Sequence, residues 1–286
     1  MTAYRMENER LMKKDLRRTV ALLLTGTLIL AGLGACGRQG ADWRQPHPGD
    51  PAAPAEADYI RPPHVTTVTT GASGVVVIAG HSEPSVTVRL SSPNGEAHGS
   101  TAAANGAWTV EAPGSRDVRE FGLSEVIGDR VVQSEGYVAV IPGGRPAGVL
   151  LRAGTGSVAL ADADGGLRLR TIDFDAGGGT TVSGVAKAGS AVHLILDGVS
   201  AGDAHADAAG RFAITASTLI KPGQHQLVVE TPSAADQAGV AVSPPAPISG
   251  LPFHATRQVG SWRIDWLTPG GGVQSTIIID EPERRT

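Results

Sequence analysis

The chain has 286 residues, with 38 glycines, 19 prolines, one cysteine and a formal net charge of −4. This length suits two small domains with connecting segments. Abundant glycine and proline, and the lack of charged helix-forming runs beyond the first residues, favour an all-β protein with many turns. The absence of a basic cluster argues against nucleic-acid binding through charge.

Residues 1–35 have the pattern of a secretory signal. The charged stretch Met12–Arg18 precedes an apolar segment, Val20–Leu33, and small residues lead to Cys36. The apolar segment is too short for a transmembrane helix, which needs roughly 20 residues. Two alternatives are an ordinary buried thiol at Cys36 and a twin-arginine signal at Arg17-Arg18. Translation starts at Met1 or Met12.

The four residues Leu33-Gly34-Ala35-Cys36 resemble the lipobox of bacterial lipoproteins. The resemblance implies that the thiol of Cys36 is acylated, that the chain is cut before it, and that the new amino terminus is acylated too. The protein would then be bound to the lipid bilayer in the bacterial cell envelope. Gly37, where inner-membrane lipoproteins have Asp, implies the outer membrane by the same resemblance.

The segment 36–63 is predicted to be a disordered, Pro/Ala-rich tether. It has no apolar periodicity, and proline recurs along it. The alternative is an ordered loop packed on the first domain. Because residues 1–35 hold six basic and three acidic side chains, the rest of the chain carries 18 basic against 25 acidic residues. With Cys36 lipidated, no disulfide can form, and core packing must hold the domains together.

An internal repeat predicts two domains, at 64–144 and 157–247. Gly80 and Gly106 are 26 residues apart, as are Gly184 and Gly210, and an aromatic residue follows each second glycine. The flanking segments alternate apolar and polar residues, which is typical of half-buried antiparallel strands. Since one sheet cannot cover its own apolar face, each copy is predicted to form a β-sandwich.

The second copy resembles bacterial Ig-like modules. The match is Val-x-Gly-x-Ala-x-x-Gly-x-x-Val at 182–192, then Ala-Asp-x-x-Gly-Arg-Phe at 206–212, then Pro-Gly-x-His-x-Leu-x-Val at 222–229. The first copy departs more from the pattern. The resemblance implies tandem Ig-like sandwiches, which serve as spacers or adhesive units in envelope proteins.

The remaining segments are predicted as connections and a hairpin. Residues 145–156 are expected to be a linker, and the second domain is expected to open with Val158-Ala159-Leu160. Two strands around Thr268–Gly272 predict a C-terminal β-hairpin within 248–286. Trp262, Ile264 and Trp266 share one face of its first strand. If exposed, the tryptophans form an aromatic platform for a sugar ring or a partner; if buried, they complete the sheet packing.

Other polar residues make weaker patterns. Asp173 is the twelfth position of a loop that begins at Asp162, as in a calcium loop, but Leu167 stands at the sixth position, where a glycine is required. A plain turn is the alternative, and Asp173 and Asp175 are then outward strand residues beside Phe174. His193 and the His205-x-Asp207 pair lack the convergence of a zinc site. We expect no metal, no cofactor and no catalytic constellation.

The sequence therefore predicts a non-catalytic, membrane-anchored envelope lipoprotein that presents Ig-like domains as a spacer or protein-interaction arm. The alternative is a carbohydrate- or peptidoglycan-binding lipoprotein that uses the Trp262/Trp266 hairpin. Partners beyond the bilayer would be an envelope protein or peptidoglycan.

Overall fold

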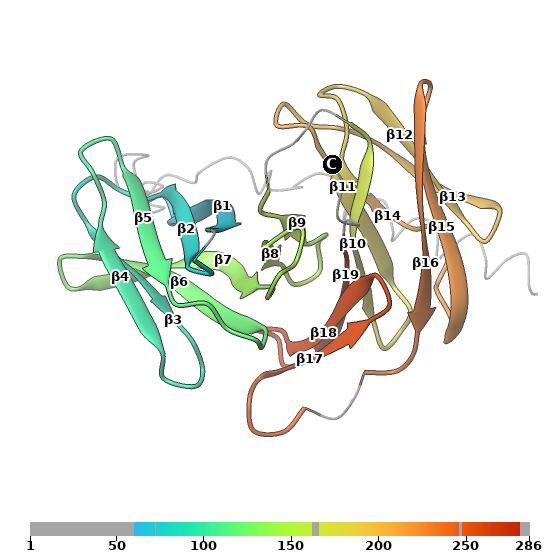
Figure 1. The fold of residues 1–286 in the computed structure, drawn as a ribbon. Helices are drawn as coiled ribbons and strands as arrows, with labels where there is room; N and C mark the ends of the chain where they lie inside the picture. Colours follow the sequence, from blue (N-terminus) through green and yellow to red (C-terminus); the bar gives the residue numbers. More distant parts are fainter. Residues whose placement is uncertain (1–59, 72, 162–165, 246–247, 281–286) are drawn as a thin grey trace, which may run out of the picture. The chain divides into compact units, whose positions relative to one another are not determined.

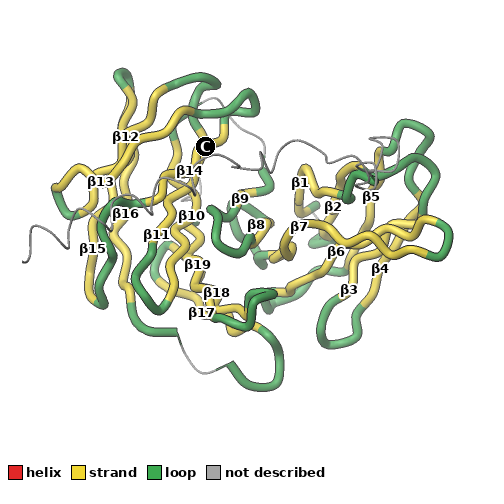
Figure 2. The backbone as a smooth tube through the Cα atoms, turned by 180° about the vertical axis from the view of Figure 1, so that it is seen from behind, coloured by secondary structure: helices red, strands yellow, loops and turns green. Residues whose placement is uncertain are grey.

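A computed structural model describes residues 60–280 except 72, 162–165 and 246–247. Every regular element in this part of the chain is a strand, which confirms the all-β prediction (Figures 1 and 2). No helix among these residues is long and apolar enough to cross a bilayer. The signal, Cys36 and most of the predicted tether lie outside the described residues.

The first sandwich contains seven strands in two sheets. A sheet of order β1-β2-β5 faces strands of order β4-β3-β6-β7, and both contribute to one apolar core. The strands are β1 (His64–Thr70), β2 (Val76–His81), β3 (Thr87–Ser91), β4 (Ala97–Thr101), β5 (Ala107–Ala112), β6 (Arg119–Ile127) and β7 (Arg130–Val140).

The second sandwich repeats this order. Strands β14-β11-β10 face a sheet of order β13-β12-β15-β16 across a second core. The strands are β10 (Arg168–Asp175), β11 (Thr180–Val185), β12 (Ala191–Leu196), β13 (Val199–His205), β14 (Arg211–Thr215), β15 (Gly223–Thr231) and β16 (Ala234–Val242). Both copies thus have the two-sheet architecture of Ig-like and fibronectin type III domains.

The repeat extends to local geometry. A Cβ added to Gly80 would lie 2.5 Å from the ring of Trp108, and one added to Gly184 would lie 2.7 Å from the ring of Phe212. Each glycine therefore lets the aromatic ring lie flat on the neighbouring strand. The first two strands of each copy also have a register shift, between Val65/Thr67 and between Leu169/Thr171. A bulge at the same place bends both sheets alike.

Five further strands extend the two sandwiches. β8 (Gly148–Leu151) pairs with β7, and β9 (Val158–Ala159) pairs with β8, so both belong to the larger sheet of the first sandwich. β17 (Phe253–Gln258), β18 (Ser261–Leu267) and β19 (Val273–Ile279) extend the sheet of β10, because β19 pairs with β10.

The region between the domains differs from the expected linker. Residues 145–156 include β8, whose side chains are apolar on both faces; Val149 and Leu151 are fully buried. Val158 and Ala159 do not open the second domain, and Leu160 lies in the core of the first sandwich. Burying both apolar faces of this short strand stabilises the fold, whereas an exposed linker would leave these side chains in water. The C-terminal hairpin forms as β18 and β19, with β17 as a third strand.

Candidate functional site

A third apolar cluster connects the two sandwiches, and we call it the joint. Its buried members from the first sandwich and its extension are Val118, Ala139, Ile141, Val149 and Leu151, and those from the second are Ile264, Trp266 and Ile278. Tyr137, Phe253, Ala255 and Trp262 pack around it with partial exposure. The joint forms because β8 and the end of β7 carry apolar side chains on both faces, and β18 presents Ile264 and Trp266 to them from the second sandwich.

Trp266 lies at the centre of the joint. Its side chain has no exposed surface, and its ring meets Tyr137 edge-on with 6.0 Å between ring centroids. Its Nε1 donates a hydrogen bond of 3.1 Å to Oγ1 of Thr276. Edge-to-face pairs contribute about 0.5–1.5 kcal/mol beyond area burial.

The two tryptophans do not form an open platform. Trp266 is buried, and Trp262 is partly buried, with its ring under the guanidinium of Arg257 at 5.2 Å. The two tryptophans instead complete the packing of the sheet, which was the alternative prediction. Trp262, Ile264 and Trp266 lie on one face of β18, as predicted, and this face packs into the joint. A flat sugar ring has no access to Trp266.

A buried carboxylate fixes the polar side of the joint. Asp173 accepts hydrogen bonds from the backbone N–H and Oγ of Ser157, from Oγ1 of Thr276 and from Nε2 of Gln274, at 2.6–3.1 Å. Burial raises the pKa of Asp173, while these four hydrogen bonds favour the charged form. The expectation that Asp173 points outward to solvent is wrong, because the turn before β9 covers it; Asp175 is exposed as expected.

Further hydrogen bonds hold this turn against the second sandwich. Gln274 donates from Nε2 to the carbonyl of Arg152, and its Oε1 accepts from the backbone N–H of Gly154. At the other end of the segment, the backbone N–H of Arg145 donates to Asp280 at 2.8 Å. The predicted linker is therefore bonded at both ends to β19 and the residue that follows it.

A second buried charge lies on the opposite face of β18. Nε of Arg263 is 2.8 Å from Asp265, and its Nη1 and Nη2 donate to Ser243. Ser275 also donates to Asp265 at 2.6 Å. The guanidinium lies 5.3 Å from the ring of Phe174.

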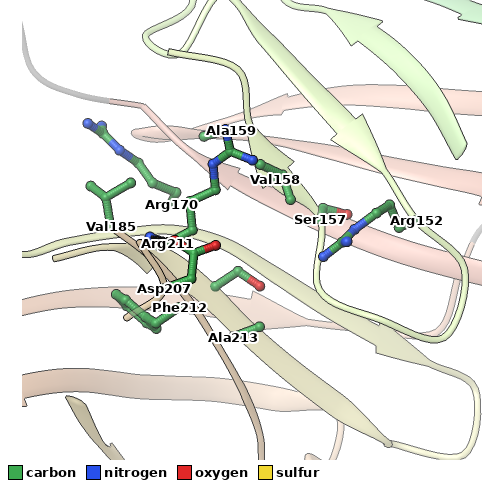
Figure 3. A pocket seen from close by; sticks show the side chains of 12 residues that line it. Arg152, Ser157, Val158, Ala159, Arg170, Val185, Asp207, Arg211, Phe212 and Ala213 are labelled. Carbon is green, nitrogen blue, oxygen red and sulfur yellow. Dashed lines mark hydrogen bonds between the residues drawn. The ribbon is translucent and has the colours of Figure 1, made fainter. Parts of the chain in front are cut away.

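A small cavity lies beside the joint. It has a volume of about 190 Å³ and is lined by residues of the β8–β9 segment and of β10, β11 and β14 (Figure 3). Arg170 and Arg211 lie together in it with Asp207, and Arg152 lies beside Ser157. Nε and Nη2 of Arg152 both donate to the carbonyl of Gly156. The lining combines these charged side chains with apolar ones, among them Val158, Val185 and Phe212.

The weaker metal predictions find no support among the residues that the structure describes. Asp162 and Asp164 fall outside them. His193 pairs with Asp203 at 2.7 Å on an exposed face, and His205 is exposed. No group of three or more His, Cys, Asp or Glu side chains converges in the described segments.

One buried charged group in a groove was not predicted from the sequence. Glu120 lies on β6 next to Phe121 and exposes only 3% of its surface. Its neighbours in the sequence, Arg119 and Phe121, do not indicate that it is buried, because a single glutamate beside a core residue is usually exposed to solvent. The groove that it lines also contains residues of the second sandwich more than 130 positions away.

No family model matches this chain, and no curated protein matches it. Solved structures similar to it include the BSP domain of a biofilm-associated protein, at 14% identity and a TM-score of 0.22. That match covers 65% of this chain and 30% of the other, so the chain spans less than a third of its length.

Two further solved structures are similar to this chain at comparable identity. The fibronectin type III array of RIM-binding protein is 14% identical with a TM-score of 0.25, covering 78% of this chain and 90% of the other. A Ca²⁺-stabilised adhesin that helps an Antarctic bacterium to reach out and bind ice is 15% identical, with a TM-score of 0.21, covering 77% and 66%. The fold assignment here rests on the strand pairing described above.

Proposed function

We propose that this protein is a non-catalytic lipoprotein of the bacterial outer membrane, anchored by acyl chains on Cys36. Its two Ig-like sandwiches act together as a rigid spacer that holds an interaction surface away from the bilayer. Its partners are the lipid bilayer at one end and an envelope protein at the other.

The joint carries the spacer part of this proposal. Two domains on a free linker reorient independently, because interfaces between domains of one chain are small and polar by default. Here Trp266, Ile264 and Ile278 pack on apolar residues of β7 and β8, and the Asp173 hydrogen bonds hold the turn between them. These contacts favour one fixed arrangement of the two sandwiches.

The lipobox pattern carries the anchor. Burial of an acyl chain contributes about 0.8 kcal/mol per methylene, and more than one chain makes attachment effectively permanent. The tether of residues 36–63 separates the anchor from β1, which begins at His64. A fully extended chain of that length reaches roughly 80 Å.

Membrane fractionation tests the anchor. Cys36→Ala removes the only thiol, and we expect the chain to move from the detergent-extracted membrane fraction to the soluble fraction. Gly37→Asp is the matched control: it keeps the thiol, so the chain stays membrane-bound, and by the sorting rule it moves to the inner membrane. A Cys36→Ala chain that remains membrane-bound would refute the anchor.

A further inference from the structure

A groove of about 530 Å³ runs along the outer face of the first sandwich's larger sheet. One wall is formed by residues of β3, β6 and β7, including Arg89, Glu120 and Tyr137. The other wall comes from the second sandwich and contains the apolar side chains of Pro252, Leu267 and Pro269. The groove therefore exists only while the two sandwiches are held together.

Glu120 is the buried charge in this groove. Its neighbour Phe121 is fully buried in the core of the first sandwich, so Glu120 points to the opposite, groove-lining face of β6. It exposes 3% of its surface, and its Oε2 has no hydrogen-bond partner in the described part of the chain. Burial alone raises the pKa of Glu120 to about 7.

The other titratable groups lining the groove are Arg89 and Tyr137. Neither forms an ion pair or a hydrogen bond with Glu120 in the structure. A buried carboxylate without a donor is costly, and natural folds keep few of them. A cation that reaches the other carboxylate oxygen, Oε1, would compensate the buried charge.

The surroundings select the kind of donor. A divalent metal needs several oxygen ligands, and the described residues bring no second carboxylate or imidazole group into a cluster with Glu120. A guanidinium binds a carboxylate through both oxygens, but Oε2 of Glu120 is buried. An ammonium is a compact charge with three donors that needs one carboxylate oxygen and neutral acceptors. Ser91, Ser124, Gln133 and Ser134 line the groove and offer such acceptors.

We propose that this groove binds the side chain of a lysine on a partner protein, with its ammonium against Glu120. The apolar wall of Pro252, Leu267 and Pro269 suits the four-carbon stem of lysine, which packs on apolar surfaces while its charge reaches a polar group. The site would give the interaction arm a defined recognition element.

The test titrates the full-length chain with Nα-acetyl-lysine methylamide as the probe, and ligand-observed NMR measures the binding. At pH 8 we expect saturable binding, and Glu120→Gln should weaken it about tenfold or more, since a charge-assisted hydrogen bond is lost. Glu111→Gln, at an exposed glutamate of β5, is the matched control and should bind like the wild type. The Nα-acetyl-arginine analogue and the Nε-acetylated lysine should bind more weakly than the probe.

The pH dependence separates this site from non-specific attraction. Between pH 8 and pH 5.5, affinity of the wild type should fall roughly 30-fold, because Glu120 becomes protonated, while Glu120→Gln should show no such change. The proposal would be overturned if wild type and Glu120→Gln bound the probe equally well, or if binding did not depend on pH. It would also be overturned if no binding were seen at probe concentrations up to about 20 mM. It rests on the interaction part of the proposed function, and its failure would leave the anchor and joint tests unaffected.

Discussion

Replacing Trp266 by alanine should destabilise the protein more than any other single truncation in the joint. The indole is completely buried, packs edge-on against Tyr137 and donates to Thr276. Truncation of a buried aromatic residue to alanine costs about 3–5 kcal/mol from lost transfer energy and the cavity that remains. The truncation also removes the hydrogen bond that Oγ1 of Thr276 accepts from the indole, while its bond to Asp173 remains.

We therefore expect a loss of about 4 kcal/mol in the free energy of unfolding. Urea unfolding followed by far-ultraviolet circular dichroism measures it, since the signal does not depend on tryptophan. Trp266→Phe keeps one aromatic ring but removes the N–H donor and part of the buried volume, so its expected loss is smaller, about 2 kcal/mol. Leu267→Ala is the control: Leu267 follows Trp266 on β18 and is 38% exposed, so its change should stay within about 0.5 kcal/mol.

The transition of Trp266→Ala should also broaden or split. With the joint weakened, each sandwich can unfold by itself, which breaks two-state behaviour. A loss below about 1 kcal/mol, equal to that of Leu267→Ala, would show that the indole is not packed between the sandwiches.

Three further changes test the account elsewhere. Since burial raises the pKa of Glu120 from its ordinary value of 4.5 to about 7, the folded state loses stability as pH rises between those values. Glu120→Gln should therefore gain about 3 kcal/mol over wild type at pH 8 and nothing at pH 4 in urea titrations; equal stabilities at pH 8 would contradict the burial. Asp173→Asn places an amide against the donors of Ser157 and should cost about 2 kcal/mol; an unchanged midpoint in thermal unfolding would argue against that network. Gly184→Ala puts a methyl group 2.7 Å from the ring of Phe212 and against a strand backbone, so it should lose at least about 2 kcal/mol, whereas an unchanged chemical denaturation curve would rule out the flat packing of the ring.

The sequence patterns predicted the features that depend on residues close together in the chain, namely the strands and the two repeated sandwiches. Alternation of apolar and polar residues predicted half-buried strands beside the repeated glycines. The apolar residues of these strands lie in the two cores, Val88 and Leu90 in the first and Val192 and Leu194 in the second. The glycine spacing predicted two matched sandwiches, because each copy needs its aromatic residue against a strand glycine.

The sequence patterns did not predict what depends on contacts between distant segments. β8 is only four residues long and lies among glycines and prolines, so its pairing with β7 has no local signal. Asp173 alternates like a solvent-exposed strand residue, but the turn before β9 and the side chains of Gln274 and Thr276 on the distant β19 surround its carboxylate. Alternation predicted that Trp262 and Trp266 share one face of β18. It could not predict that this face is covered by β7 and β8, which lie more than 100 residues earlier in the chain.

The most direct test of the rigid arm is the backbone ¹⁵N relaxation of the unacylated full-length Cys36→Ser chain. If the joint holds, amides of the first sandwich (β1–β7) and of the second (β10–β16) report one common rotational correlation time, that of the combined body. Two distinct and shorter correlation times, one for each sandwich, would contradict the account.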